Sequence, residues 1–265
     1  MTLVQIIVLA LIQGLTEFLP VSSSAHLILG GIAFGWPDQG LVFDVATHLG
    51  TLFAALVYFR RDWLDMAGAC LKPVSTAADR QHRKMAVLIV LATLPALLVG
   101  GLAPDFVETY LRDVTVIAWT TLGFGILLGV VDRFSPRDRG AESLGMRDAL
   151  LIGLAQAAAL VPGVSRSGIT MTAGRMLGLS PDAAARFSFL MAVPIIAAAG
   201  SYGVLRVAEG RAGIDWLQFA IAMGLSFLAG WLCIAGFLAL IRRFGLMPFV
   251  IYRIFLGVAL LWLLY

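Results

Sequence analysis

The sequence predicts an all-α integral membrane protein, and three features support this: its composition, its long apolar segments and two interrupted apolar segments. Of its 265 residues, 60% are hydrophobic and 13% are charged, whereas soluble proteins average about 45–50% and 25%. Six segments are apolar over roughly the 20 residues that a helix needs to cross about 30 Å of hydrocarbon. These expected spans are Val42–Phe59, Met85–Leu102, Val114–Val131, Ala183–Val204, Trp216–Ile241 and Met247–Leu264. We therefore expect a single membrane domain over residues 1–265.

Two further apolar segments, Leu3–Phe34 and Met146–Leu179, are interrupted midway. The first break holds Pro20 followed by serines, and the second holds Pro162–Gly163 followed by Ser165–Gly168. Each half is too short to span a bilayer, and non-helical backbone at membrane depth is tolerated only where protein or a wet cavity covers it. We expect two broken or re-entrant helix pairs; a pair of ordinary kinked spans is the alternative.

The charged loops predict the orientation in the membrane. Basic residues gather after the first, third and fifth spans, which places those loops in the cytoplasm. They are Arg60, Arg61, Lys72, Arg80, Arg83, Lys84, Arg133, Arg137, Arg139, Arg147, Arg242 and Arg243. The opposite loops hold Asp105, Glu108, Asp113, Glu209 and Asp215, with Arg112, Arg206 and Arg211. Both termini are then expected on the outer side.

The chain also repeats itself, with one unit at about residues 1–140 and another at about 141–265. A shift of 143 aligns the two breaks, and a shift of 138 lays ATHLGTLFA over AARFSFLMA, pairing His48 with Arg186. The pairs at the breaks are Gln13 with Gln156, Val21 with Val164, Ser22 with Ser165, Ser23 with Arg166, Ser24 with Ser167, and Ala25 with Gly168. Because each unit has three spans after its break, the second should enter from the opposite face. This predicts an inverted-topology repeat whose breaks meet near the midplane.

The second break has the residues of an anion site. Arg166 lies in PGVSRSGIT, at the expected start of a helix, where backbone N–H groups and a guanidinium can bind phosphate together. A buried ion pair with Glu17 is the alternative for Arg166. The expected phosphate-binding residues are Ser22, Ser165, Arg166, Ser167, Gly168, Thr170 and Arg186. For Arg186 pairing or snorkelling is the alternative, and Arg175 and Arg253 are expected to pair or snorkel.

The first break has the residues of a nucleophile and a base. Ser22 and Ser23 precede His26 by four and three residues, so on a helix both hydroxyls lie on the face of the imidazole. A hydroxyl beside a histidine is a candidate nucleophile with its base. Helix capping is the alternative for each serine.

Gln13 and Glu17 share a face of the helix that precedes the first break. A carboxylate at this depth should be protonated, paired with His26 or Arg166, or bound to a cation with the Gln13 oxygen as a further ligand. Packing between polar helices is the alternative for Gln13. Three other polar residues are expected to support the site from outside: Asp44, His48 and Gln156.

With these motifs the sequence resembles the undecaprenyl-pyrophosphate phosphatase family of bacterial inner membranes, of the bacitracin-resistance type. The family carries an [E/Q]-x-x-x-E motif that runs into a serine-rich stretch with a histidine, and a second motif P-G-x-S-R-S-G-x-T. The first matches Gln13, Glu17, Pro20, Ser22, Ser23 and His26; the second matches Pro162, Gly163, Ser165, Arg166, Ser167, Gly168 and Thr170. The similarity extends through DVATHLGTLFA and ARFSFLMAVP, and so over the whole chain.

The resemblance implies removal of the terminal phosphate from undecaprenyl pyrophosphate, which returns the monophosphate carrier to peptidoglycan synthesis. It also implies a divalent cation, Mg²⁺ or Ca²⁺, and an active site open to the periplasmic side. Gln13 stands where the family can have Glu, so weaker cation binding is expected. The expected partners are a polyprenyl pyrophosphate and membrane lipids, without nucleic acid; a homodimer is left open.

The mechanism we expect is attack by Ser23 on the terminal phosphorus, with His26 accepting its proton and Arg166 stabilising the phosphate charge. Glu17 would hold the cation or orient His26. In a rival mechanism His26 activates water without a covalent step. Inverted repeats with broken helices also occur in transporters, so movement of a polyprenyl phosphate across the bilayer is the alternative function. Sequestration of a pyrophosphate-binding antibiotic is a third.

Overall fold

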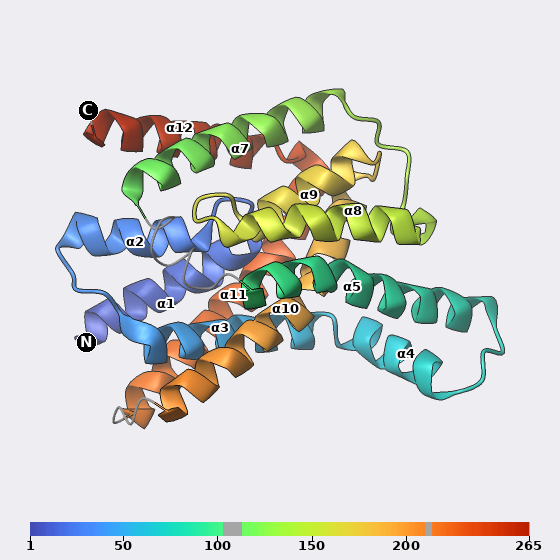
Figure 1. Cartoon of the computed structure of the whole chain (residues 1–265), viewed down its shortest axis with the longest axis horizontal. Coiled ribbons are helices and arrows are strands. Elements are labelled where there is room, and N and C mark those ends of the chain that lie inside the picture. Colours follow the sequence, from blue (N-terminus) through green and yellow to red (C-terminus); the bar gives the residue numbers. More distant parts are fainter. Residues whose placement is uncertain (103–112, 210–213, 265) are drawn as a thin grey trace.

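The structure is a computed structural model that describes residues 1–102, 113–209 and 214–264, which are predominantly helical (Figure 1). The α-helices are α1 (Leu3–Phe18), α2 (Ser23–Phe34), α3 (Gly40–Tyr58), α4 (Arg60–Leu71), α5 (Ala77–Leu102), α7 (Val114–Phe134), α8 (Met146–Ala157), α9 (Arg166–Met176), α10 (Pro181–Glu209), α11 (Trp216–Phe244) and α12 (Met247–Leu264). Short 3₁₀ turns lie at Ala141–Ser143 and Ala158–Leu160. Six of these helices, α3, α5, α7, α10, α11 and α12, are long and apolar enough to cross a membrane. The expected fold class is confirmed.

The stretch between the first two expected spans differs from the sequence prediction. The prediction placed a loop there, but α4 forms at Arg60–Leu71 and α5 already begins at Ala77 rather than at Met85. The reason lies at the start of α5, where Thr76 and Asp79 bond each other reciprocally: the Thr76 hydroxyl accepts from the Asp79 N–H at 3.0 Å, and the Asp79 carboxylate accepts from the Thr76 N–H at 2.9 Å. Such a capping box starts a helix even among polar residues.

The two interrupted segments are broken as expected, and the breaks share an unusual backbone. Ser22 and Ser165 have φ values of 73° and 70°, and within the described part of the chain they are the two residues other than glycine with positive φ. Each serine also caps the next helix, because its hydroxyl accepts from the N–H of Ala25 or Gly168, at 3.4 and 3.1 Å. The repeated positions therefore have the same local geometry, while opposite insertion of the two units stays a prediction.

Arg253 on α12 joins the two breaks. Its side chain is fully buried and donates to the carbonyl of Pro20 in the first break at 3.3 Å and to those of Gly163 and Val164 in the second, both at 2.9 Å. The expected pairing or snorkelling of Arg253 is wrong, because these carbonyls have left the helical hydrogen-bond pattern and need donors. Arg175 does pair, with Asp132 at 2.9 Å.

Small residues allow α11 to lie directly against α1 and α3. A Cβ at Gly14 would meet Ala229 and the Ser226 carbonyl, and a Cβ at Gly50 would meet the backbone of Met223 and Phe227. Close backbone approach through small residues is a common mode of helix packing in membranes. This packing fixes α1, and with it the first break, relative to the spanning helices.

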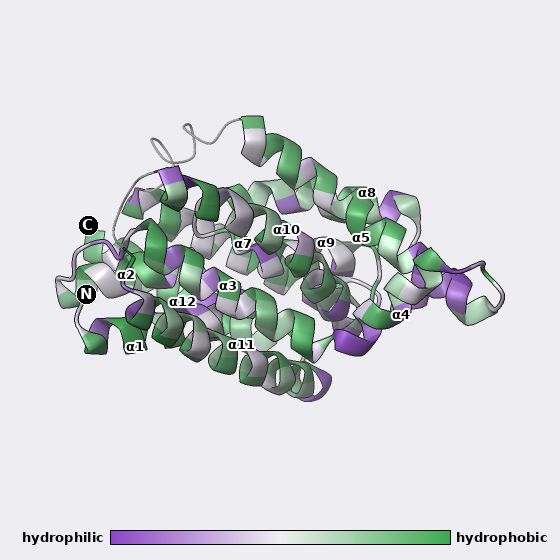
Figure 2. Cartoon of the chain, turned by 90° about the horizontal axis from the view of Figure 1, so that it is seen from below, coloured by the Kyte–Doolittle hydropathy of each residue, from purple (hydrophilic) through white to green (hydrophobic). Residues whose placement is uncertain are grey.

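The two ends of the molecule differ in polarity. Both termini lie at the same end in Figures 1 and 2, and hydrophilic residues gather at the other end, where α4 meets α5 (Figure 2).

Among the residues that predict the outer face, Asp113 lies at the start of α7. The side chain and N–H of Thr115 bond the Asp113 carboxylate and lower the pKa of Asp113. Four of the residues that predict the outer face lie outside the described residues: Asp105, Glu108, Arg112 and Arg211.

We expect Gly50→Leu to destabilise the protein by about 3 kcal/mol, because the new side chain would have to separate α3 from α11. Thermal unfolding of the purified protein in detergent would show this as a lower midpoint. Gly224→Leu is the matched control, since a Cβ at Gly224 meets nothing within 4 Å. Equal midpoints for the two variants would contradict the close packing.

Candidate active site

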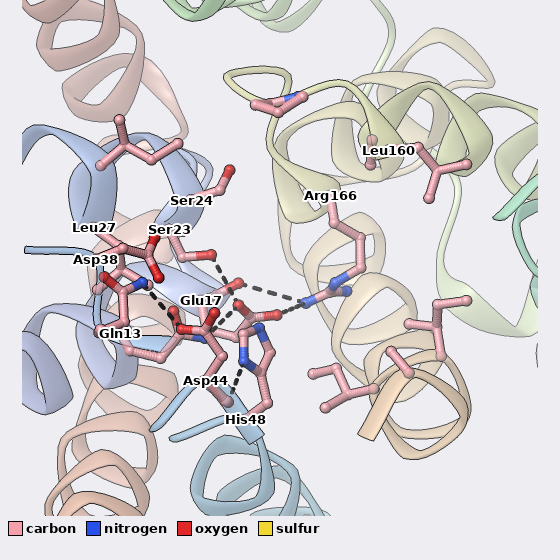
Figure 3. Close-up of a pocket in the computed structure, with 17 residues that line it drawn as sticks. Gln13, Glu17, Ser23, Ser24, Leu27, Asp38, Asp44, His48, Leu160 and Arg166 are labelled. Carbon is pink, nitrogen blue, oxygen red and sulfur yellow. Dashed lines mark hydrogen bonds and ion pairs between the residues drawn. The ribbon is translucent and has the colours of Figure 1, made fainter. Parts of the chain in front are cut away.

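A cavity of about 600 Å³ lies where the two broken segments meet, within the usual range for ligand sites. Figure 3 shows α1 and α2 on one side of it and the second break with α9 and α10 on the other. Its polar lining residues are Gln13, Glu17, Ser23, Ser24, Asp38, Gln39, Asp44, His48 and Arg166. Its apolar lining residues are Leu27, Ile28, Ala159, Leu160, Pro162, Ile195, Ile196 and Ala199. The lining of the cavity therefore combines charged and polar groups with many apolar side chains.

Glu17 is the centre of the polar contacts. The Ser23 hydroxyl donates to Glu17 Oε2 at 2.9 Å, and Arg166 Nη2 lies 3.6 Å from Glu17 Oε1. In Figure 3 Ser23 and Arg166 approach this carboxylate from opposite sides of the cavity. Ser23 and Arg166 are the first residues of α2 and α9, so the turns at Ser22 and Ser165 present them at equivalent places. Residues 143 apart in the sequence thus meet at one carboxylate.

Arg166 forms the ion pair with Glu17 that was the alternative to phosphate binding, but one of its N–H groups has no partner among the described residues. Its Nη1 donates to the Ser188 carbonyl at 3.2 Å. Its Nε–H is buried and has no partner among the described residues. Because an unpaired buried donor is costly, a phosphate oxygen that reached Nε would satisfy it. The pairing with Glu17 and the binding of an anion are compatible.

Gln13 completes the polar side. Its Nε2 donates to Glu17 Oε2 at 2.9 Å, while its Oε1 is buried and accepts no hydrogen bond from the described residues. Amide and carboxylate oxygens suit Mg²⁺ and Ca²⁺. The described residues contain no cluster of three or more His, Cys, Asp or Glu side chains that could hold a metal. The oxygens of Gln13 and Glu17 fit a cation that takes its other ligands from phosphate and water.

His26 does not contact the Ser23 hydroxyl, contrary to the expected pair. Its Nδ1 donates to the Ser22 carbonyl at 2.7 Å, and its Nε2 lies 2.5 Å from the Tyr252 hydroxyl. Because a carbonyl can only accept, Nδ1 carries a proton, and in neutral His26 the Tyr252 hydroxyl donates to Nε2. Both ring nitrogens of His26 are therefore engaged by groups other than Ser23. Glu17 takes the place beside the hydroxyl.

The expected phosphate-binding residues of the second break divide into two groups. Ser165 lines a smaller cavity of about 90 Å³ beside Arg166, together with Ser22 and Ser23 of the first break. Ser167, Gly168 and Thr170 line neither this nor the larger cavity, and each is engaged elsewhere. The Ser167 hydroxyl donates to the Leu19 carbonyl, the Gly168 N–H donates to the Ser165 hydroxyl, and the Thr170 hydroxyl contacts that of Ser188 at 2.7 Å. Their hydrogen bonds hold the break in place.

Arg186 lines neither cavity at the breaks, contrary to its expected contact with phosphate. It bonds Asp62 at 2.9 Å and lines a separate cavity of about 220 Å³. The helix face explains this, because Ser188, whose carbonyl accepts from Arg166, follows Arg186 by only two residues, and residues two apart point to nearly opposite sides of a helix. Pairing, the alternative for Arg186, is what the structure shows.

Of the three residues expected to support the site from outside, two line the cavity and the third, Gln156, does not. Asp44 and His48 line the cavity directly, with His48 Nδ1 donating to the Asp44 carbonyl at 2.7 Å. Gln156 lines neither cavity at the breaks and donates to the Ala92 carbonyl at 3.2 Å.

Sequence reasoning missed several residues of the site. Asp38 and Gln39 reach the cavity from the segment before α3, Tyr252 reaches His26 from α12, and Ile195 and Ile196 form part of the apolar wall. No motif marks them, and Tyr252 lies 226 residues from its partner His26. The sequence signal for Asp38 and Gln39 was their closeness to Asp44, and Gln39 Nε2 does donate to Asp44 at 3.0 Å.

Comparison with known proteins identifies the family. Residues 6–259 match the family described as bacitracin resistance protein BacA. An undecaprenyl-diphosphatase of Colwellia psychrerythraea is 52% identical, with 99% of each chain covered. Undecaprenyl-diphosphatase 2 of Stutzerimonas stutzeri is 50% identical over 98% of each chain, and an undecaprenyl-diphosphatase of Hahella chejuensis is 49% identical over 100% of this chain and 99% of its own. The chain therefore belongs to the bacitracin resistance protein BacA family.

Proposed function

We propose that this protein hydrolyses undecaprenyl diphosphate to undecaprenyl phosphate and inorganic phosphate. The observation that carries the proposal is the contact of Ser23 and Arg166 with one buried carboxylate, Glu17, on the wall of a cavity inside a membrane protein. The cavity suits a lipid diphosphate, because its lining combines charged and polar groups with many apolar side chains. The relatives are named undecaprenyl-diphosphatases, which supports a phosphatase over a transporter.

In the proposed mechanism Ser23 is the nucleophile. Its Oγ bonds to the terminal phosphorus, and the bond from that phosphorus to the bridging oxygen breaks, so that undecaprenyl phosphate leaves with the bridging electron pair. Glu17 accepts the proton of Ser23, since the hydroxyl already donates to it at 2.9 Å. Glu17 then releases this proton to water in the cavity. In the second step a water oxygen bonds to the phosphorus of the phosphoserine and the bond from phosphorus to Ser23 Oγ breaks, so that inorganic phosphate leaves; Glu17 accepts a proton from the attacking water and returns a proton to Ser23 Oγ. In the rival route, water attacks the diphosphate directly.

Arg166 stabilises the charge that spreads over the phosphoryl oxygens. As Glu17 becomes protonated, its attraction for Arg166 falls, and the guanidinium is released toward the phosphate. His26 acts through the backbone: by bonding the Ser22 carbonyl and Tyr252 it fixes the turn that positions Ser23. This assignment differs from the sequence expectation, in which His26 was the base.

Gln13 Oε1 and Glu17 would hold a divalent cation. The cation would neutralise part of the diphosphate charge and make the departing phosphate a better leaving group. The unpartnered Gln13 oxygen supports this assignment. We further propose that the protein lies in the bacterial inner membrane with the cavity open to the periplasm, supported by the basic loops at the end opposite the termini.

Arg166→Gln should lower the turnover number by about 10³-fold or more, because the phosphoryl charge loses its main stabilising group. Phosphate release from a polyprenyl diphosphate measures it. Arg186→Gln is the matched control and should keep near-normal activity, since Arg186 lines a different cavity. The proposal fails if the two variants lose activity equally while both remain folded in detergent.

Ser23→Ala should abolish phosphate release, and the wild-type enzyme, quenched in acid during turnover, should yield a peptide with phosphate on Ser23 by mass spectrometry. Ser24→Ala should be much milder, because Ser24 contacts Ser22 and makes no bond to Glu17. Full turnover by Ser23→Ala would exclude the covalent route and leave direct attack by water.

Gln13→Glu should lower the Mg²⁺ concentration needed for half-maximal activity several-fold, because a second carboxylate beside Glu17 attracts the cation more strongly. Activity of both proteins is measured across a Mg²⁺ series after EDTA treatment. Gln39→Glu adds the same charge to another part of the cavity and should have a smaller effect. Activity unaffected by EDTA in every protein would contradict a cation requirement.

A further inference from the structure

A second lipid-facing feature lies away from the active site. A groove of about 330 Å³ runs between α5 and the first residue of α8, and we call it the basic groove. It is lined by Arg80, Arg83, Lys84, Val87, Leu88 and Met146. None of these residues lines either cavity at the breaks. Val87 and Met146 are 46% and 65% exposed, so the groove is open to the surroundings of the protein.

Five of the six lining residues form one stripe along α5. Arg80, Arg83, Lys84, Val87 and Leu88 follow the spacing of a single helical face, with three cations first and two aliphatic residues after them. The composition of α5 changes at the same place, since no charged residue follows Lys84 before the helix ends at Leu102. The basic groove therefore lies where α5 passes from the aqueous boundary into hydrocarbon. A phospholipid has its phosphate at this depth.

The residues that line the basic groove include no negative charge. Its lining contains three cations and no carboxylate, and no ion pair to any of the three is present in the described ranges. By contrast, Arg139 and Arg175 each pair with an aspartate.

Backbone carbonyls hold two of the cations without neutralising them. Arg83 donates through Nε and Nη2 to the Ala69 carbonyl, at 3.0 and 2.8 Å, and through Nη2 to that of Lys72 at 2.7 Å. Lys84 Nζ donates to the Glu142 carbonyl at 3.0 Å. The positive charge is thus held in place and available to an anion.

We propose that the basic groove binds an anionic glycerophospholipid. The lipid belongs to the membrane leaflet at the end of the protein where α4 meets α5, opposite the two termini (Figure 2). The head-group phosphate lies against Arg80 and Lys84, and an acyl chain follows Val87, Leu88 and Met146 toward the membrane interior. A pocket that joins cations to an apolar wall between membrane helices suits such a lipid. A soluble anion would leave the apolar half of the groove unused, so the lipid is the better fit.

The test titrates the purified full-length protein in neutral detergent with phosphatidylglycerol or with phosphatidylcholine of the same acyl chains. Native mass spectrometry counts the lipid adducts. We expect tighter binding of phosphatidylglycerol, and roughly tenfold weaker binding in the double variant Arg80→Gln/Lys84→Gln. Both side chains are exposed, so the variant should fold, which size-exclusion chromatography checks.

Three controls test whether the basic groove itself holds the lipid. Arg133→Gln/Arg243→Gln removes the same charge at other exposed positions at the ends of α7 and α11 and should leave binding unchanged. Arg166→Gln should also leave it unchanged, because it alters only the active-site cavity. Excess inorganic phosphate should not displace the lipid. Equal binding of the two lipids, equal loss in the two double variants, loss in Arg166→Gln, or displacement by phosphate would each overturn the proposal.

Discussion

The structure depends on satisfying backbone carbonyls at the two breaks, deep inside an apolar protein. A helix that stops within the membrane leaves polar groups that water does not reach, and each costs several kcal/mol if it stays unpaired. Arg253 donates to carbonyls of both breaks at once. One side chain from α12 thereby holds together two segments that are far apart in the sequence, and the active-site residues sit at the helix starts that follow.

Charge balance explains why an acid can lie in this place. Glu17 is buried, and an isolated carboxylate would be strongly disfavoured there. Arg166, Ser23 and Gln13 surround it with one cation and two hydrogen-bond donors. The same contacts prepare the proposed chemistry, because the nucleophile already shares its proton with the base, and the guanidinium that balances the base in the resting state can turn to the phosphate. The Gln13 oxygen and the Arg166 Nε–H lack partners among the described residues, and in the proposed mechanism these are the atoms that a bound ligand would satisfy.

The active site and the basic groove differ in how their positive charge is balanced. In the active site, one buried cation is matched by a carboxylate, so that a diphosphate must compete for it. In the basic groove, three cations near the surface have no carboxylate beside them in the lining. The first arrangement favours turnover, since the product must leave, while the second would suit lasting occupancy by the proposed phospholipid. Both use the same pairing of cationic and apolar surfaces at different depths.

The sequence by itself determined the class of fold, the six spans, the positions of the breaks and the functional motifs, because apolar length, proline and serine act locally. It also placed Glu17, Ser23 and Arg166 in one site through the alignment of the breaks. The tertiary structure decided which side chains actually meet. In the folded chain Ser23 bonds Glu17 rather than His26, and His26 bonds Tyr252. Arg186 lines another cavity, and Arg253 bonds the carbonyls of both breaks. Helical spacing tells which residues share a face, but the direction of a side chain at a strained turn, and its partner from a helix more than 200 residues away, depend on packing that only the folded chain contains.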